Sequence, residues 1–302
     1  MEVILAEWLD ANLPLVELAK ELGIRYCCQA HGTDITAGLN DAGVRRVYER
    51  YNTVDFVIAP SEFGRRQLLQ CGISAERTRV VRHAVGVPEG PARRESGRVR
   101  CLAVGRMDPM KGPLLVIDAV HRAMQACPDL HLDYVGDGAM MPAARELSER
   151  HQIQDRVTFH GFVPHENVLA MMRRSHILIQ PSVAFERRYD TCPVTVAEAM
   201  ANGMAIVASR HGGIPEQIVD GESGLLADED DTRTMGEQLV ALVTDSALRY
   251  RLGQAAFLRA KEMFSLETIR AQWLDLLGVN GYEERSETSR RSSNGAEGHG
   301  SL

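Results

Sequence analysis

The sequence predicts an α/β protein built from two Rossmann-like, doubly wound domains. Short apolar segments typical of buried strands alternate with helical patterns along the chain, without a repeat of about 20 to 50 residues. The segment 86–97 holds two prolines and three glycines, which is typical of a linker. We therefore expect a first domain over 1–90 and a second over 91–279.

In the first domain, apolar residues recur at helical spacing from Leu13 to Leu22, and Gly23 ends the pattern. Ser61 is a good N-cap for a second helix that runs to about Cys71. Between and after these helices lie apolar runs that we expect to form strands at 25–30, 56–59 and 79–85. The loop His31–Asp34 follows the first of them, at a strand end where ligands of open α/β sheets bind.

The second domain shows the same alternation over a longer span. We expect strands at 99–105, 130–135, 157–163, 176–180, 205–208 and 225–226, and helices at 114–124, 166–172, 194–202, 232–244, 246–264 and 266–277. From Asn280 the chain is polar and charged with almost no apolar residue, so 280–302 is predicted to be a disordered tail.

Composition excludes several classes of protein. A formal net charge of −7 and a pI near 5.8 are unlike a nucleic-acid binder, which carries a basic excess. The six cysteines show neither CxxC nor zinc-site spacing, so we expect buried thiols in a reducing compartment. No apolar run approaches the roughly 20 residues of a membrane helix, and the first residues lack a signal-peptide pattern. We expect a cytoplasmic protein, with peripheral contact at the inner membrane face left open.

The segment from Pro181 to Leu226 carries the strongest site signal. Thr191 lies at a position where helices favour a side-chain oxygen as N-cap. Pro193 is tolerated at a helix start because an N–H at this position would have no partner within the helix. A phosphate would then bind at the positive end of the helix. Its partners would be the backbone N–H groups of Thr191, Cys192 and Val194, whereas Pro193 in the same run has no N–H. Asp190 and Glu198 flank this predicted phosphate site, and carboxylates accept hydrogen bonds from hydroxyl groups. The pattern suits a diphosphate between two sugars.

A second cationic loop follows the strand at 99–105. Arg106 and Lys111 lie in a loop before the helix at 114–124, and an Arg can grip two phosphate oxygens while a Lys adds a point charge. The alternative is a solvated turn with two surface cations. Gly136 opens a Gly-x-Gly loop after the next strand, but Met141 stands where a dinucleotide fingerprint needs glycine or alanine. A nicotinamide oxidoreductase is therefore disfavoured, and Gly136 is expected to line the cleft.

The run from Asp190 to Glu198, followed by Gly212-Gly213-Ile214-Pro215-Glu216 and by Asp220-Gly221 to Leu226, resembles the donor-binding core of the retaining glycosyltransferases of family 4. Within that family the chain is similar to polysaccharide-assembly enzymes of the colanic-acid type. The family pattern is Glu-x7-Glu, and here Asp190 replaces the first acid. The resemblance implies the two-domain GT-B fold, with an N-terminal, acceptor-side domain that is incomplete because family members carry more sheet before the equivalent of Met1.

The resemblance also assigns roles. It implies that Glu198 holds ribose hydroxyls, that Asp190 holds hydroxyls of the transferred sugar, and that His31 lies near the donor sugar and acceptor. From the sequence alone, an equally good interpretation is that His31 is a structural residue whose hydrogen bonds go to backbone groups in a turn. Arg106, Lys111 and the helix start would stabilise the departing diphosphate, so neither a metal nor another cofactor is expected. His160 is expected to be structural, and Glu216 and Asp220 are assigned to helix and turn chemistry.

The function expected from these observations is a hexosyltransferase-type enzyme. It would move a sugar from a nucleoside-diphosphate sugar to an acceptor hydroxyl with retention, in cell-surface polysaccharide assembly, with a lipid-linked glycan at the membrane surface as acceptor and no nucleic-acid partner. The alternative from another class is a shortened chain that binds a nucleotide-sugar without transferring it.

Overall fold

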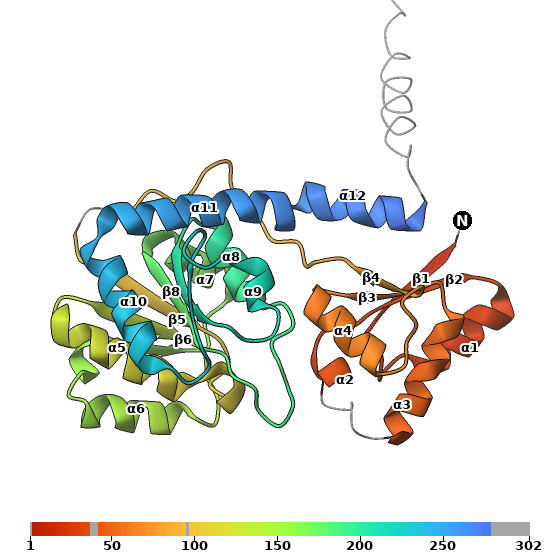
Figure 1. The fold of residues 1–302 in the computed structure, drawn as a ribbon, viewed down its shortest axis with the longest axis horizontal. Helices are drawn as coiled ribbons and strands as arrows, with labels where there is room; N and C mark the ends of the chain where they lie inside the picture. Colours follow the sequence, from red (N-terminus) through yellow and green to blue (C-terminus); the bar gives the residue numbers. More distant parts are fainter. Residues whose placement is uncertain (1, 37–41, 95–96, 279–302) are drawn as a thin grey trace, which may run out of the picture.

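The computed structural model describes residues 2–36, 42–94 and 97–278, and these residues form two parallel β-sheets with helices packed on them (Figure 1). Residues 81–94 and 97–99, which lie between the last strand of the first sheet and the first strand of the second, contain no helix or strand. The α/β class and the division into two parallel sheets are as predicted from the sequence. The predicted tail 280–302 lies outside the described residues.

The first sheet has four parallel strands in the order β1-β2-β3-β4. Gly23 ends α1 in the left-handed conformation, and the Ser61 hydroxyl caps α4 by accepting the Gly64 N–H at 3.0 Å, both as predicted. The elements are β1 (Val3–Glu7), α1 (Leu13–Leu22), β2 (Arg25–Gln29), α2 (Thr33–Thr36), α3 (Ala42–Tyr48), the 3₁₀ helix η1 (Glu49–Thr53), β3 (Phe56–Ala59), α4 (Glu62–Gln70) and β4 (Thr78–Val80).

The second sheet has six parallel strands in the order β10-β9-β8-β5-β6-β7. The chain runs from β5 outward to β7 and then returns to the other side of β5 to form β8, so the strand order reverses between β5 and β8. Such a reversal opens a crevice beyond the carboxyl ends of the two strands. The strands are β5 (Arg100–Val104), β6 (His131–Val135), β7 (Val157–Gly161), β8 (Ile177–Gln180), β9 (Ala205–Ser209) and β10 (Leu225–Ala227).

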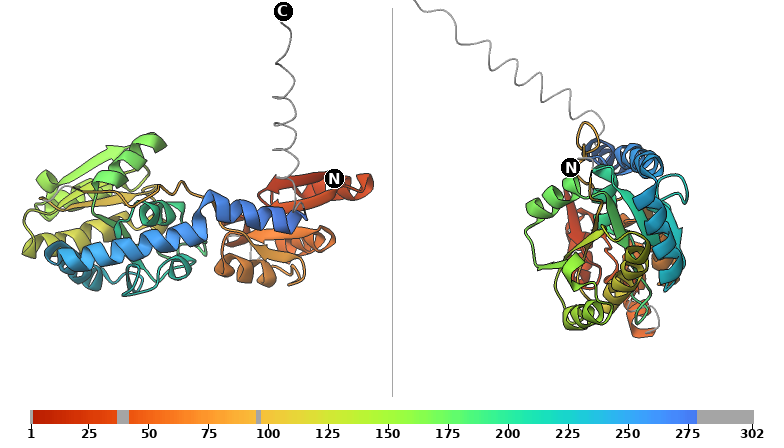
Figure 2. Two further views of the ribbon diagram at one scale, coloured as in Figure 1. Left: turned by 90° about the horizontal axis from the view of Figure 1, so that it is seen from above. Right: turned by 90° about the vertical axis from the view of Figure 1, so that its left-hand side faces the viewer.

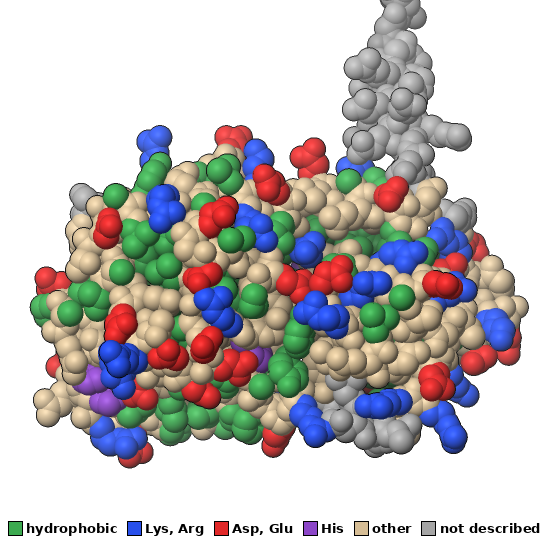
Figure 3. Space-filling model, in the orientation of Figure 1, with side chains coloured by type: hydrophobic (Ala, Val, Ile, Leu, Met, Phe, Trp, Pro, Cys, Tyr) green, Lys and Arg blue, Asp and Glu red, His purple; other side chains and the backbone are tan. Residues whose placement is uncertain are grey.

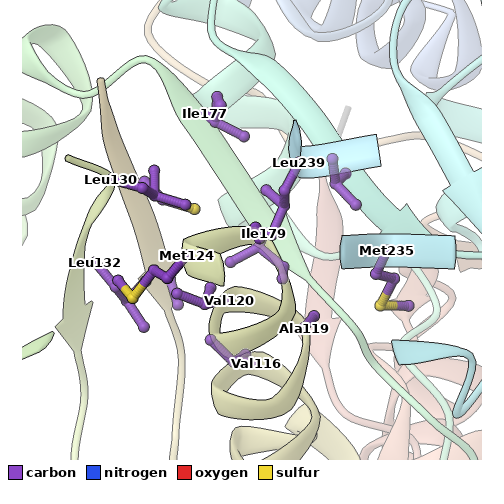
Figure 4. Close-up of a cluster of buried hydrophobic side chains, with 14 of the residues drawn as sticks. Val116, Ala119, Val120, Met124, Leu130, Leu132, Ile177, Ile179, Met235 and Leu239 are labelled. Atoms are coloured by element: carbon purple, nitrogen blue, oxygen red, sulfur yellow. The ribbon is translucent and has the colours of Figure 1, made fainter. Parts of the chain in front are cut away.

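The helices of the second sheet cover both of its faces (Figure 1). They are η2 (Pro109–Lys111), α5 (Pro113–Ala126), α6 (Met141–Arg150), η3 (Gln154–Arg156), α7 (His165–Arg174), α8 (Val194–Ala201), α9 (Ile214–Gln217), α10 (Thr232–Thr244) and α11 (Ser246–Phe264). On one face, side chains of α5 and α10 meet those of β8 and the β6 region, as Figure 4 shows for Val120, Leu239, Ile179 and Leu132. This packed layer fixes the strands whose ends carry the candidate site.

The last helix, α12 (Leu266–Leu277), crosses back to the first sheet (Figure 2). Ile269 is buried against Cys27, Ile58 and Val81, and the Arg25 guanidinium donates to the Leu277 carbonyl at 2.7 Å. Our sequence-based division placed 266–277 in the second domain, but by packing this helix belongs to the first. The two domains are therefore joined twice, by the segment around 81–99 and by the α11–α12 connection.

β1, α3 and α6 are among the elements that were not predicted. β1 follows no turn or cap, and α3 and α6 contain few buried apolar residues. The strand expected at 79–85 is shorter, because only Thr78–Val80 pairs with β3. The six cysteines are all free and buried, as predicted. No helix in the described part of the chain has the length and apolar character needed to cross a membrane.

Candidate active site at the strand-order reversal of the second sheet

Lys111 and Asp190 meet in the crevice of the second sheet. Lys111 ends the loop after β5, and Asp190 lies in the loop after β8, so the reversal of strand order brings them side by side. The Lys111 ammonium lies 2.7 and 2.9 Å from the two carboxylate oxygens of Asp190. Both side chains are largely buried, with 16% and 9% of their surface exposed. The predicted cation and the predicted acid thus form one ion pair.

Asp190 has a second partner on the same loop. The Ser182 hydroxyl donates to its Oδ2 at 2.5 Å, and Gln180 in turn donates to Ser182 at 2.8 Å. Burial acts to raise the pKa of Asp190, but the charge of Lys111 and the hydrogen bonds from Lys111 and Ser182 outweigh it, so the pKa lies below its ordinary value. Asp190 is therefore held as a carboxylate.

A buried histidine supports the Asp190 backbone from behind. The Asp190 N–H donates to His211 Nε2 at 3.0 Å, and His211 Nδ1 lies 2.7 Å from a carboxylate oxygen of Glu229. His211 therefore carries its proton on Nδ1 and donates a hydrogen bond from this nitrogen to Glu229. The other Glu229 oxygen accepts the Ala184 N–H at 2.8 Å. Sequence reasoning missed this support, because His211 and Glu229 belong to separate turns.

The turn at His211–Gly213 touches the Asp190 loop so closely that side chains are excluded. The Gly213 N–H donates to the Asp190 carbonyl at 2.9 Å. A Cβ on Gly213 would lie 1.8 Å from the Thr191 carbonyl oxygen, and one on Gly212 would lie 2.1 Å from that of Asp190. Glycine is therefore required at both positions because the two backbone segments lie so close together, and not only because the chain turns here.

Thr191 does not cap the following helix. Pro193 is the N-cap of α8, and no side chain bonds to its first turn within the described residues. The Thr191 hydroxyl instead donates to the His31 carbonyl at 2.7 Å, so the capping role that we predicted for Thr191 is wrong. Val194 is the first residue of α8 and is exposed, while Cys192 is buried. The first turn of α8 thus has no side-chain cap among the described residues, and anion binding there stays a prediction.

Four hydrogen bonds among the described residues join this segment to the first domain. Besides the bond from Thr191 to His31, the Ser61 hydroxyl donates to the Thr191 carbonyl at 2.6 Å. Glu216 on α9 accepts the Glu62 and Phe63 N–H groups, at 2.8 and 2.5 Å, at the start of α4. Glu216 therefore has the helix role that we assigned to it, although the helix start that it binds belongs to the first domain. Asp220 does bond within its own turn, accepting the Leu226 N–H.

The His31 side chain lies in a small cluster at the carboxyl end of the first sheet. Its Nε2 is 2.5 Å from a Glu7 carboxylate oxygen, and its ring packs between Trp8 and His83 with centroid separations of 4.5 and 5.4 Å. The His31 N–H donates to Asp34 at 3.0 Å. His31 is therefore fixed by backbone and side chain alike, with its carbonyl bonded to Thr191.

Arg106 and Gly136 lie in neighbouring loops on the same edge of the second sheet. A Cβ on Gly136 would lie 1.9 Å from the Gly105 carbonyl oxygen, so the two loops touch. The Arg106 side chain is 68% exposed and pairs with Asp108 at 3.1 Å. Its ionic partner among the described residues is thus local, and the structure does not bring its guanidinium to the Lys111–Asp190 pair.

Glu198 projects from the second turn of α8 with 12% of its side chain exposed. Its partner among the described residues is His165, the first residue of α7, whose Nε2 lies 2.6 Å from Oε1. Sequence reasoning did not find His165, because it lies 33 residues away on another helix. His160, expected to be structural, bonds to Asp133 at 2.7 Å.

The site is chemically mixed. A buried cation, a fixed carboxylate, an open helix start and a second carboxylate can hold a polar molecule that carries both anionic and hydroxyl groups. Within the described residues there is no group of three or more His, Cys, Asp or Glu that could hold a metal ion. On the face seen in Figure 3, acidic and basic side chains are interspersed over both domains.

Comparisons with known proteins agree with this architecture. The family model described as Glycosyl transferases group 1 matches residues 91–259, and the one described as Glycosyltransferase Family 4 matches residues 3–87. The GT-B fold is shared with HepE from Anabaena, solved in complex with UDP, at a TM-score of 0.79 and 20% identity, over 92% of this chain and 79% of that one. With more than half of its length matched, the chain belongs to the group 1 glycosyl transferases.

Two curated relatives show how far the similarity extends. WcaL of Escherichia coli K12, named as a colanic acid biosynthesis glycosyltransferase, is 26% identical over 255 residues, which cover 80% of this chain and 61% of the relative. The D-inositol 3-phosphate glycosyltransferase of Corynebacterium efficiens is 31% identical over 164 residues, covering 52% of this chain and 38% of the relative. The chain thus spans less than two thirds of either relative.

Proposed function

We propose that this protein is a glycosyltransferase that moves a sugar from a nucleoside-diphosphate sugar to an acceptor hydroxyl with retention of configuration. The observation that carries the proposal is the Lys111–Asp190 pair at the strand-order reversal, beside the open start of α8. Membership of the group 1 family supports it, as does HepE, which has been solved with UDP and with UDP-glucose.

Each proposed role follows from position and charge. The diphosphate binds at the start of α8, along Thr191–Val194, where Lys111 and Arg106 supply positive charge for the leaving group without a metal. Binding there requires Arg106 to leave Asp108, which its 68% exposure allows. Glu198 accepts ribose hydroxyls and Asp190 accepts hydroxyls of the transferred sugar. Gly136 lines the cleft.

His31 is assigned to the acceptor side of the reaction. Its carbonyl bonds to Thr191, which places its loop between the first sheet and the proposed donor site. A proton acceptor near the reacting hydroxyl assists transfer. We propose hexosyl transfer onto a lipid-linked glycan in cell-surface polysaccharide assembly, which is supported by the name of the WcaL relative. The protein would act in the cytoplasm, at the inner membrane face.

The test is a screen of UDP- and GDP-sugars for thermal stabilisation of the full chain, followed by nuclear magnetic resonance of the released sugar or product. We expect one donor to raise the melting temperature and to yield a product with the donor's anomeric configuration. Glu198→Ala should weaken nucleotide binding, and His31→Ala should impair transfer while donor binding survives. A donor that binds but is never turned over would favour the alternative, a binding module.

A further inference from the structure

We propose that His165 is a positioning residue for the nucleotide, acting through Glu198 to select a donor whose ribose carries a 2′-hydroxyl. This inference rests on the proposed function, because it concerns how the same site reads its donor. It starts from the 2.6 Å contact between His165 Nε2 and Glu198 Oε1. An ionised carboxylate only accepts hydrogen bonds, so the proton of this bond lies on His165 Nε2.

The contact leaves one side of the carboxylate available. Oε1 accepts from His165, whereas no described residue donates to Oε2. A carboxylate has about four acceptor positions, so a bound Oε1 can still accept a second hydroxyl while Oε2 accepts a first. Two hydroxyls on neighbouring carbons, as in ribose, match the two oxygens. His165 therefore fixes the plane in which Glu198 presents its two carboxylate oxygens to the ribose.

The two partners differ in exposure, which separates positioning from stability. His165 is 69% exposed and Glu198 12%. A pair with one solvated partner contributes little to folding stability. A free glutamate side chain, however, must be ordered before it can accept two hydroxyls, and a partner that orders it in advance removes this cost from binding. His165 is thus expected to affect affinity and leave the fold intact.

Position in the fold supports the same role. β7 ends at Gly161, and the chain passes Phe162, which is 84% exposed, before α7 begins at His165. Glu198 lies on α8, whose open start is the proposed diphosphate seat. His165 and α8 therefore flank the space that a nucleoside attached to that diphosphate would occupy.

The experiment uses calorimetry on the full-length protein with whichever of UDP and GDP binds the wild type more tightly, and with its 2′-deoxy analogue. For His165→Ala we expect the dissociation constant of the ribonucleotide to rise about five- to tenfold and that of the deoxy analogue by less than about twofold. His165→Gln, which can donate to the same oxygen, should restore most of the affinity. His151→Ala is the matched control, since His151 pairs with Asp118 at 2.7 Å away from the site.

Any of three results with His165→Ala itself would overturn the inference alone: an unchanged affinity, an equal loss for the two analogues, or tighter binding, which would make His165 a competitor of the ribose. The loss should also disappear when His165→Ala is combined with Glu198→Ala, and an additive loss would contradict action through Glu198. If the wild type binds neither UDP, GDP nor their sugars, both the proposed function and this inference fail.

Discussion

Asp190 is a buried carboxylate whose charge is balanced by the Lys111 ammonium and which also accepts a hydrogen bond from the Ser182 hydroxyl. Removing one partner of such a pair leaves an uncompensated buried charge, which costs about 3–5 kcal/mol. Lys111 therefore serves the fold as well as the proposed chemistry. For this reason Lys111→Ala is expected to lower stability and turnover together.

The pKa of Asp190 predicts how stability depends on pH. Because Lys111 and Ser182 hold this pKa below its ordinary value, the ionised group stabilises the folded state above the unfolded pKa of about 4, and this stabilisation is lost as the pH falls through the folded pKa. We expect the difference in unfolding free energy between the wild type and Asp190→Asn to shrink steadily below about pH 4. Urea titrations from pH 7 to pH 3 measure it, and a difference independent of pH would contradict the assignment.

At the residue scale, the sequence predicted which side chains matter better than it predicted their partners. Lys111 and Asp190 were each placed in the site, but 79 residues separate them and no local pattern predicts that they form an ion pair. The Thr191 hydroxyl was expected in a cap, yet it bonds across the domains to His31. A long-range acceptor can displace a local one whenever tertiary packing brings it closer, and spacing along the chain does not record this.

Loops after the strands are the elements that build the site. The loops after β5, β8 and β9 meet at one edge of the second sheet, and the turn at Gly212–Gly213 packs directly on the Asp190 backbone. His211 and Glu229 then hold that backbone from the buried side. The position of Asp190 is therefore set by backbone contacts between loops rather than by its own helix.

Gly213→Ala tests this dependence. Its Cβ would lie 1.8 Å from the Thr191 carbonyl oxygen, so the loop or the turn must move, at a cost of about 1–3 kcal/mol. We expect nucleotide affinity to fall at least about tenfold, measured by calorimetry. Gly86→Ala is the control, because no atom lies within 4 Å of its added Cβ. Equal affinity in the two variants would show that the turn does not set the site.

Most helices and all strands of the second sheet were predicted well. The boundaries of α1, α10, α11 and α12 agree with those expected, and the strands from β5 to β10 were all expected. α6 was missed because no side chain caps its start and only Ala144 and Ser148 of its ten residues are buried. A helix with neither a capping residue nor many buried apolar residues gives the sequence little to mark it.

At the scale of the whole molecule, contacts between segments that are distant in sequence hold the two domains together. Ser61, Thr191 and Glu216 join the two domains beside the site, and α12 binds the first sheet from the far end of the chain. The site lies between the domains, so its geometry depends on both attachments. Neither attachment was predicted, because both pair segments that are distant in sequence.

Ile269→Ala tests the attachment of α12. Ile269 is 4% exposed and packs near Cys27, whose pKa burial raises to about 11. Truncation of a buried isoleucine costs about 2–5 kcal/mol, so α12 should open more often and expose the Cys27 thiol. We expect faster alkylation of Cys27 at pH 8, mapped by mass spectrometry, with Cys101 in the second domain unchanged. Equal protection of Cys27 in wild type and variant would argue against this packing.

The central claim is that the crevice between β5 and β8 binds a diphosphate. The most direct measurement compares the affinities of UDP and uridine, or of GDP and guanosine, in the wild type, in Lys111→Ala and in Lys111→Arg, after circular dichroism has confirmed folding. We expect the wild type to prefer the diphosphate at least about a hundredfold, Lys111→Arg to retain much of this preference, and Lys111→Ala to lose at least about tenfold of it. A preference that is the same in all three proteins, or no binding of either nucleotide, would contradict the account.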